Sequence, residues 1–187
     1  GRDMAALFTK DTQAIFWNNN KSAIQRMLDY DYTIDRKTPS VAAIVAPTSS
    51  SKFEKFFYGP DEIMVPMFRS TTEAAEAFPD ADVLLNFASF RTAYDVTMEA
   101  IAIKDQFKTI MVTAEGIPER LARGMNQAAR DAGVTVIGPA TVGGIAPGAF
   151  KIANVGGTIE NIVNSRLHRA GSCGLMTRSG GLFNELS

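Results

Sequence analysis

The stretch VLLNFASFRTAYDVTMEAIAIKDQFKTIMVTAEGIPERLARGMNQAARDAGVTVI, residues 83–137, decides the fold. Short apolar runs of β type at 83–87, 109–113 and 134–137 alternate in it with segments of helical period at 93–103 and 119–132. Gly133 follows the second of these segments and is a typical helix stop. Strands that alternate with helices are typical of a parallel sheet with crossover helices, so the stretch predicts an α/β fold.

The same alternation extends toward the N-terminus. Residues 14–17 and 41–46 are apolar runs, and residues 22–28 between them have helical period. Residues 47–66 are Ser-rich and then aromatic, and they predict an excursion with a short hairpin before 63–65 returns to the sheet. We therefore expect one Rossmann-like domain over residues 5–170, in which 138–148 is a structured Gly/Pro-rich loop and 157–167 a short helix.

A new βα unit begins near the end of the sequence. Residues 174–177 form a short β-type run, and 178–187 look like a turn that opens another helix. A helix that follows the first strand of such a unit packs against a sheet, and further strands are needed to form that sheet. Residues 171–187 therefore predict the start of a second domain that is cut short.

Composition excludes several classes of partner. The 187 residues carry 19 Lys+Arg against 20 Asp+Glu, which leaves a formal charge of −1 and no electrostatic footprint for a nucleic acid or an anionic membrane. One cysteine and one histidine provide neither an internal disulfide nor a metal cluster, and a reducing cytoplasm suits this usage. No apolar run approaches the length of a bilayer span. Any anionic ligand must be held locally.

Four loops that follow predicted strands are candidates for a ligand crevice: 18–22, 86–91, 115–118 and 178–181. In an open α/β sheet the crevice lies beyond the carboxyl ends of the strands, where helix N-termini can bind phosphate without a large basic patch. The loop 18–22 lacks the glycines of a dinucleotide fingerprint, which argues against simple NAD binding. An Asn-rich structural turn and a phosphate site are equally compatible with this loop.

Individual residues in these loops have both structural and functional interpretations. Ser89 is a natural N-cap, and Arg91 in a first helical turn would face a phosphate or an acidic partner, because the helix dipole disfavours a cation there. A solvated arginine is the alternative. Glu115 and Pro118 close another strand, and the glutamate could simply compensate a helix dipole. The Ser-Gly-Gly turn at 179–181 would expose backbone N–H groups to an oxyanion.

Five phrases run through nearly the whole chain: MLDYDY (27–32), NFASFRTAYD (86–95), TAEGIPE (113–119), VIGPATVGGIAPGAFKIAN (136–154) and TRSGGLFNEL (177–186). At these residues the chain resembles the family of succinyl-CoA synthetase α chains and ATP-citrate lyases. Its sequence at 138–143 and 178–181 favours the ATP-citrate lyases over the succinyl-CoA synthetase α chains. The resemblance implies a Rossmann-like CoA-binding domain with a parallel sheet, followed by a flavodoxin-like second domain.

The resemblance also implies an activity. ATP phosphorylates a histidine, the phosphoryl group passes to citrate, CoA displaces phosphate to give citryl-CoA, and a lyase domain cleaves citryl-CoA to acetyl-CoA and oxaloacetate. This chain would bind coenzyme A and be inactive alone. ATP and Mg would be bound by an ATP-grasp domain or subunit, and the lyase domain would also be a partner, within a homo- or hetero-oligomer. The alternatives are a citryl-CoA synthetase, a succinyl-CoA synthetase α subunit or a non-catalytic CoA-binding module.

Site residues follow from the same resemblance. Glu115 is implied as the catalytic carboxylate beside the phosphohistidine and the thioester-forming centre, and Ser179, Gly180 and Gly181 as the helix N-terminus that receives the phosphohistidine or citryl phosphate. His168, at a predicted helix C-terminus, is interpreted as a dipole-favoured surface residue and not as the phosphohistidine. The implied CoA-binding residues are Asn18, Lys21, Ser22, Lys55, Phe56, Phe87, Ser89, Arg91, Ile117 and Pro118.

Overall fold

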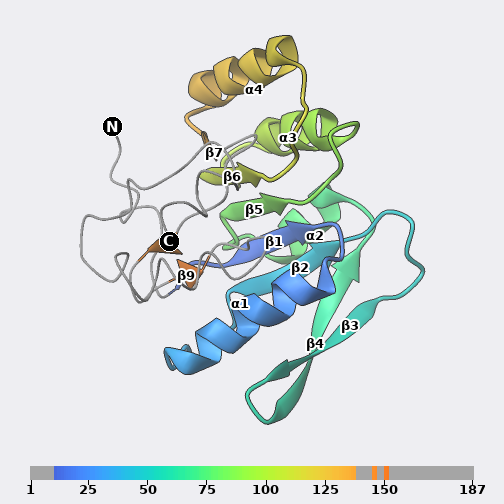
Figure 1. Ribbon diagram of the computed structural model, residues 1–187, viewed down its shortest axis with the longest axis vertical. Coiled ribbons are helices and arrows are strands. Elements are labelled where there is room, and N and C mark those ends of the chain that lie inside the picture. Colours follow the sequence, from blue (N-terminus) through green and yellow to red (C-terminus); the bar gives the residue numbers. More distant parts are fainter. Residues whose placement is uncertain (1–10, 138–144, 147–149, 152–187) are drawn as a thin grey trace.

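Seven strands form one sheet in the computed structural model, which describes residues 11–137, 145–146 and 150–151 (Figure 1). They are β1 (Ala14–Trp17), β2 (Val41–Val45), β3 (Phe53–Tyr58), β4 (Asp61–Phe68), β5 (Val83–Asn86), β6 (Thr109–Val112) and β7 (Thr135–Ile137). Their order is β3-β4-β2-β1-β5-β6-β7, and all neighbours are parallel except the antiparallel pair β3 and β4. Without β3, this is the doubly wound order of a Rossmann-like sheet, so the predicted fold is confirmed.

Helices cover both faces of this sheet. They are α1 (Lys21–Thr33), α2 (Thr71–Ala77), α3 (Ala93–Ala102) and α4 (Glu119–Ala132). Alternate strand residues point to opposite faces, so Phe16 packs with α1 residues such as Met27, whereas Ile15 packs with α2 and α3 residues such as Ala74. Figure 1 shows α1 in front of the sheet and α2 behind it. Each large apolar side chain buried in these layers contributes about 1.5 to 3 kcal/mol.

Local signals explain where the helices begin and end. Gly133 adopts the left-handed conformation (φ 73°) after the last residue of α4, which confirms the predicted stop. The side chain of Ser70 accepts the N–H of Glu73 and caps α2, a seven-residue helix that the sequence interpretation did not include. The hairpin of β3 and β4 confirms the predicted excursion, although β4 is longer than the predicted return at 63–65.

A buried polar network fixes the C-terminal end of α1. Ser40, just before β2, donates its N–H (2.8 Å) and its hydroxyl (2.6 Å) to one carboxylate oxygen of Asp31. Burial raises the pKa of Asp31, whereas the Ser40 hydrogen bonds and the Arg36 guanidinium lower it. Tyr58 of β3 donates its hydroxyl to the Arg36 carbonyl. These contacts join the C-terminal end of α1 to the start of β2 and to β3. They therefore fix the orientation of α1, including that of its N-terminus.

The side chain of Gln25 joins α1 to the edge strand β3. Its amide nitrogen donates to the carbonyl of Phe57 (2.8 Å), and its amide oxygen accepts the N–H of Phe57 (3.0 Å). One side chain thus satisfies both backbone groups of a residue in the outermost strand.

Few features of the C-terminal part are described. The short strands β8 (Ile145–Ala146) and β9 (Phe150–Lys151) pair antiparallel, and β9 lies beside α1. The predicted helix at 157–167 and the predicted second domain at 171–187 lie outside the described residues. None of the helices in the described ranges is both long and apolar enough to cross a bilayer.

Candidate functional site

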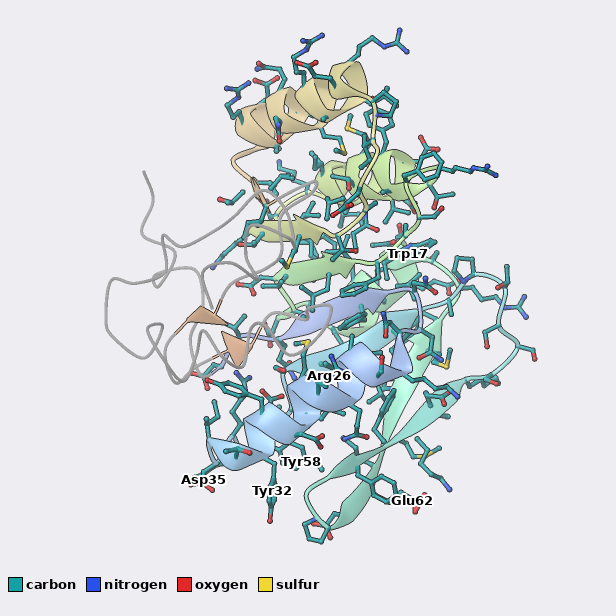
Figure 2. The ribbon with its side chains drawn as sticks, viewed as in Figure 1. Trp17, Arg26, Tyr32, Asp35, Tyr58 and Glu62 are labelled. Atoms are coloured by element: carbon teal, nitrogen blue, oxygen red, sulfur yellow. The ribbon has the colours of Figure 1, made fainter. Side chains whose placement is uncertain are left out.

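The topological switch point of the sheet lies between β1 and β5. From β1 the chain continues into α1 on one face, and from β5 it continues into α3 on the other. The loops 18–20, 87–92 and 113–118 therefore meet at one edge, where ligands of doubly wound sheets bind. Figure 2 marks this edge by Trp17, the last residue of β1. Three of the four predicted crevice loops are thus brought together, and the fourth, 178–181, lies outside the described residues.

Asn18 ties two of these loops to each other. Its side-chain amide donates to the carbonyl of Phe87 (3.2 Å), across 69 residues of sequence. Its backbone has φ 85°, in the left-handed region that glycine and asparagine adopt more readily than other residues. Asn18 therefore adopts a backbone conformation that is usual for glycine, although this loop contains no glycine.

The N-terminus of α1 faces this edge with free donors. The side chain of Asn20 accepts the N–H of Ala23 (3.1 Å) and caps the helix, and the hydroxyl of Ser22 also donates to it (3.2 Å). Within the described residues, the backbone N–H groups of Lys21 and Ser22 have no hydrogen-bond partner. Free N–H groups at the positive end of a helix dipole can bind an anion.

A buried asparagine organises the loop between β5 and α3. Asn86 is fully buried, and its side-chain nitrogen donates to the carbonyl of Ala93 and the hydroxyl of Thr97, both at 3.0 Å. Its side-chain oxygen accepts the N–H of Ala88 (3.0 Å). The backbone carbonyl of Asn86 also accepts the N–H and the hydroxyl of Thr113, each at 3.2 Å. Asn86 thereby couples the loops after β5 and β6.

The predicted capping role of Ser89 is wrong. The helix begins four residues later, at Ala93, and the Ser89 backbone carbonyl accepts the N–H groups of Thr92 and Ala93 at 3.0 and 2.8 Å. Asn86 holds residues 88 and 93, which flank the turn that precedes the helix. Arg91 consequently precedes α3 and does not lie in its first turn. Its guanidinium is 5.6 Å from the ring centroid of Phe90, and both side chains are exposed.

The loop after β6 exposes Glu115. It precedes Gly116, which has φ 84°, and Ile117, which is partly buried against the α2/α3 face of the sheet. Pro118 is the N-cap residue of α4, one position before the predicted first turn. Glu119, and not Glu115, occupies the first turn of α4.

Two residues of the hairpin predicted to contact CoA lie elsewhere. The side chain of Phe56 is 3% exposed and belongs to the core beneath α1, so it cannot present its ring to a ligand without leaving the core. Lys55 lies on the opposite face of β3 and pairs with Glu62 at 2.6 Å. The hydrogen bond to Glu62 raises the pKa of Lys55. Figure 2 shows Glu62 near the tip of the hairpin, away from the edge that Trp17 marks.

Glu54 is the hairpin residue that reaches the site, and the sequence interpretation missed it. One carboxylate oxygen lies 2.7 Å from the Lys21 ammonium, and the other accepts the side-chain N–H of Asn19 (3.4 Å). The alternation of β3 could have found it, because a hairpin strand turns every second residue to the same face. Among the described residues no cluster of three His, Cys, Asp or Glu side chains could hold a metal ion.

Proteins named ATP-citrate synthase match this chain over nearly all of its length. The Bos taurus protein is 50% identical over 183 residues, or 98% of this chain, and the Homo sapiens protein is 50% identical over 181 residues. The chain is homologous to one segment of ATP-citrate synthase. It spans 17% of the Bos taurus protein and 29% of probable ATP-citrate synthase subunit 1 from Schizosaccharomyces pombe, which is 46% identical to it. No protein-family model matches the chain.

Solved structures of ATP citrate lyase agree with this result. The Methanothrix soehngenii enzyme, in complex with citrate and coenzyme A, matches 90% of this chain with a TM-score of 0.81 and 47% identity. The chain covers 27% of that protein. An acetyl-coenzyme A synthetase from Ca. Korarchaeum cryptofilum, at 18% identity and a TM-score of 0.55, shares the fold alone. The resemblance to ATP-citrate lyases inferred from the sequence is confirmed.

Proposed function

We propose that this chain is the CoA-binding segment of an enzyme that converts citrate, CoA and ATP to acetyl-CoA, oxaloacetate, ADP and phosphate. The observation that carries this proposal is the match to an ATP citrate lyase structure solved with citrate and coenzyme A. A second homologous lyase structure, from Methanosaeta concilii, contains (3S)-citryl-CoA. The intermediates of the proposed reaction are phosphohistidine, citryl phosphate and citryl-CoA.

The donors at the edge of the switch point support CoA as the ligand. CoA carries phosphates at one end and a thiol at the other. The free N–H groups of Lys21 and Ser22 at the start of α1, with the exposed guanidinium of Arg91 across the crevice edge, would hold phosphate oxygens. Asn18 links the two loops that would hold them. The local donors explain how a chain of formal charge −1 could bind a polyanion.

Glu115 would serve the thioester-forming step at the same edge. Its exposed carboxylate follows β6, next to the loops of the proposed CoA site. There it could take the proton of the CoA thiol as the sulfur attacks citryl phosphate, or stabilise a protonated histidine. Ser179, Gly180 and Gly181 would receive the phosphorylated group, and this assignment rests on the resemblance alone.

Other parts of the enzyme would complete the reaction. An ATP-grasp domain or subunit would bind ATP and Mg, and a lyase domain would cleave citryl-CoA, in a homo- or hetero-oligomer. The single cysteine among 187 residues supports a reducing, cytoplasmic compartment.

The 187-residue chain alone is expected to bind CoA without turning it over. Titration calorimetry should show one CoA site, because the edge at the switch point is formed by residues 18–118. Citrate, ATP and CoA together should produce no citryl-CoA or acetyl-CoA, since the chain spans only 17% of its Bos taurus relative. Failure to bind CoA would overturn the proposed site, and citrate-dependent loss of free thiol would overturn the proposed division of labour.

Arg91→Ala is expected to weaken CoA binding by about 10- to 150-fold, since a hydrogen bond to a charged group is worth about 1.5 to 3 kcal/mol. Pantetheine, which lacks the phosphates, should lose nothing. Arg130→Ala is a matched control, because Arg130 is exposed in the last turn of α4, at the other edge of the sheet. Equal weakening of CoA and pantetheine would show that Arg91 acts through loop structure and not through phosphate.

A further inference from the structure

The first loop of the proposed CoA site carries a cation that the protein itself neutralises. Lys21, the first residue of α1, lies 2.7 Å from the Glu54 carboxylate, although α1 and β3 are far apart in sequence. The Lys21 side chain is 66% exposed, whereas that of Glu54 is 19% exposed. The carboxylate is therefore the fixed partner, and the ammonium is the partner that remains accessible to a ligand.

Glu54 also orients a second residue of this loop. Because an ionised carboxylate only accepts hydrogen bonds, it turns the amide nitrogen of Asn19 toward itself, at 3.4 Å. The position of Glu54 is determined by the register of the hairpin, in which Glu54 pairs with Val65, and by the packing of its neighbour Phe56 in the core. A negative charge is thus built into the wall of a site that would bind an anion.

This arrangement sets two effects against each other. The N-terminus of α1 attracts phosphate through its dipole and its free N–H groups, but it disfavours the Lys21 ammonium. Glu54 compensates that cost while no ligand is bound. A phosphate that arrives at the loop competes with the carboxylate for Lys21 and is repelled by its charge, because one ammonium near two anions is shared between them.

We propose that Glu54 sets the phosphate affinity of this loop, as an internal counter-anion with which a ligand phosphate competes for Lys21. This inference rests on the proposed function, since it assumes that the loop receives the phosphates of CoA. Glu54 lowers the affinity of the loop for phosphate ligands.

Glu54→Gln tests the proposal, because it keeps an acceptor for Asn19 and removes the charge. The variant should bind CoA and inorganic pyrophosphate about two- to fivefold more tightly than the wild type at low salt, the range expected for a partly exposed charge pair. Binding of pantetheine should not change. The gain should shrink as salt rises from 0.1 M to 1 M, because the screening length falls from about 10 Å to about 3 Å.

Two further variants separate this effect from others. In Lys21→Gln/Glu54→Gln the ammonium that would bind the phosphate is absent, so the gain in CoA affinity expected for Glu54→Gln should be lost. Glu62→Gln removes a carboxylate from a similar ion pair on the opposite face of the hairpin and should leave CoA affinity unchanged. Calorimetry gives the affinities, and circular dichroism verifies that each variant is folded.

The outcomes distinguish this inference from the proposed function. If the wild type binds neither CoA nor pantetheine, the proposed function fails. If the wild type binds CoA but Glu54→Gln binds it no more tightly, or if the double variant is as tight as the single one, the counter-anion role of Glu54 fails and the CoA site stands.

Discussion

Glu115→Gln in the complete enzyme is expected to slow citryl-CoA formation by about 100- to 10,000-fold, the usual contribution of a positioned acid or base. CoA affinity should change little, because the carboxylate would act on the reacting thiol or on a protonated imidazole and not on the bound phosphates. The position of Glu115 argues against a role in balancing the helix dipole. Glu115 lies four residues before α4, and Glu119 already occupies the first turn of that helix.

Glu119→Gln is the matched control for Glu115→Gln. Glu119 is exposed, lies at the helix terminus and pairs with Arg123 at 3.3 Å, so its loss should cost about 0.3 to 1 kcal/mol of stability and leave turnover intact. The measurements are single-turnover formation of citryl-CoA, calorimetric CoA affinity and the melting temperature. A near-normal rate for Glu115→Gln, together with a lowered melting temperature, would remove the catalytic assignment of Glu115.

Asn86→Leu is expected to destabilise the isolated chain by about 2 to 3 kcal/mol, because buried donors and acceptors lose their partners while the number of side-chain heavy atoms is kept. At about 2 to 4 °C per kcal/mol for a chain of this size, the melting temperature should fall by roughly 4 to 12 °C. The loop after β5 should also lose its fixed shape, so CoA affinity should fall with stability.

Asn126→Leu provides the comparison for Asn86→Leu, since Asn126 is an exposed amide on α4. A surface change of this kind usually stays within about 0.5 kcal/mol. Thermal unfolding of both variants measures the difference. Equal melting temperatures would show that the three side-chain hydrogen bonds of Asn86 contribute nothing net to the fold.

The periodic elements were predictable because their patterns are local. The elements at 14–17 and 119–132 have the predicted bounds. A buried strand or an amphipathic helix can be recognised from the spacing of apolar residues within its own sequence. The seven-residue α2 was not predicted because two turns carry too little periodicity to stand out. The helical segment predicted at 93–103 does begin at Ala93, but the cap was assigned to Ser89, because the turn between Ser89 and α3 leaves no periodic signal in the sequence.

The candidate site was predictable at the level of loops and less so at the level of side chains. The order of strands and helices brings the loops after β1, β5 and β6 to one edge, and this follows from topology. Lys55 and Phe56 were assigned as CoA contacts without knowledge of how β3 pairs with β4. That register turns Glu54 toward Lys21, buries Phe56 and directs Lys55 to the opposite face. The face on which each side chain lies can be assigned only when the pairing of the two strands is known.

The two hydrogen bonds of Gln25 have a consequence for how this protein behaves in concentrated solution. An outermost strand offers unpaired backbone groups to any other strand that meets it, which is a common route to aggregation. The exposed rings of Phe53 and Phe57 would make β3 an adhesive template of this kind. Gln25 imitates the peptide unit of a neighbouring strand and fills the position beside Phe57, while the charge of Lys55 separates the two rings. A single side-chain amide from α1 thus protects part of the edge strand from pairing with another strand.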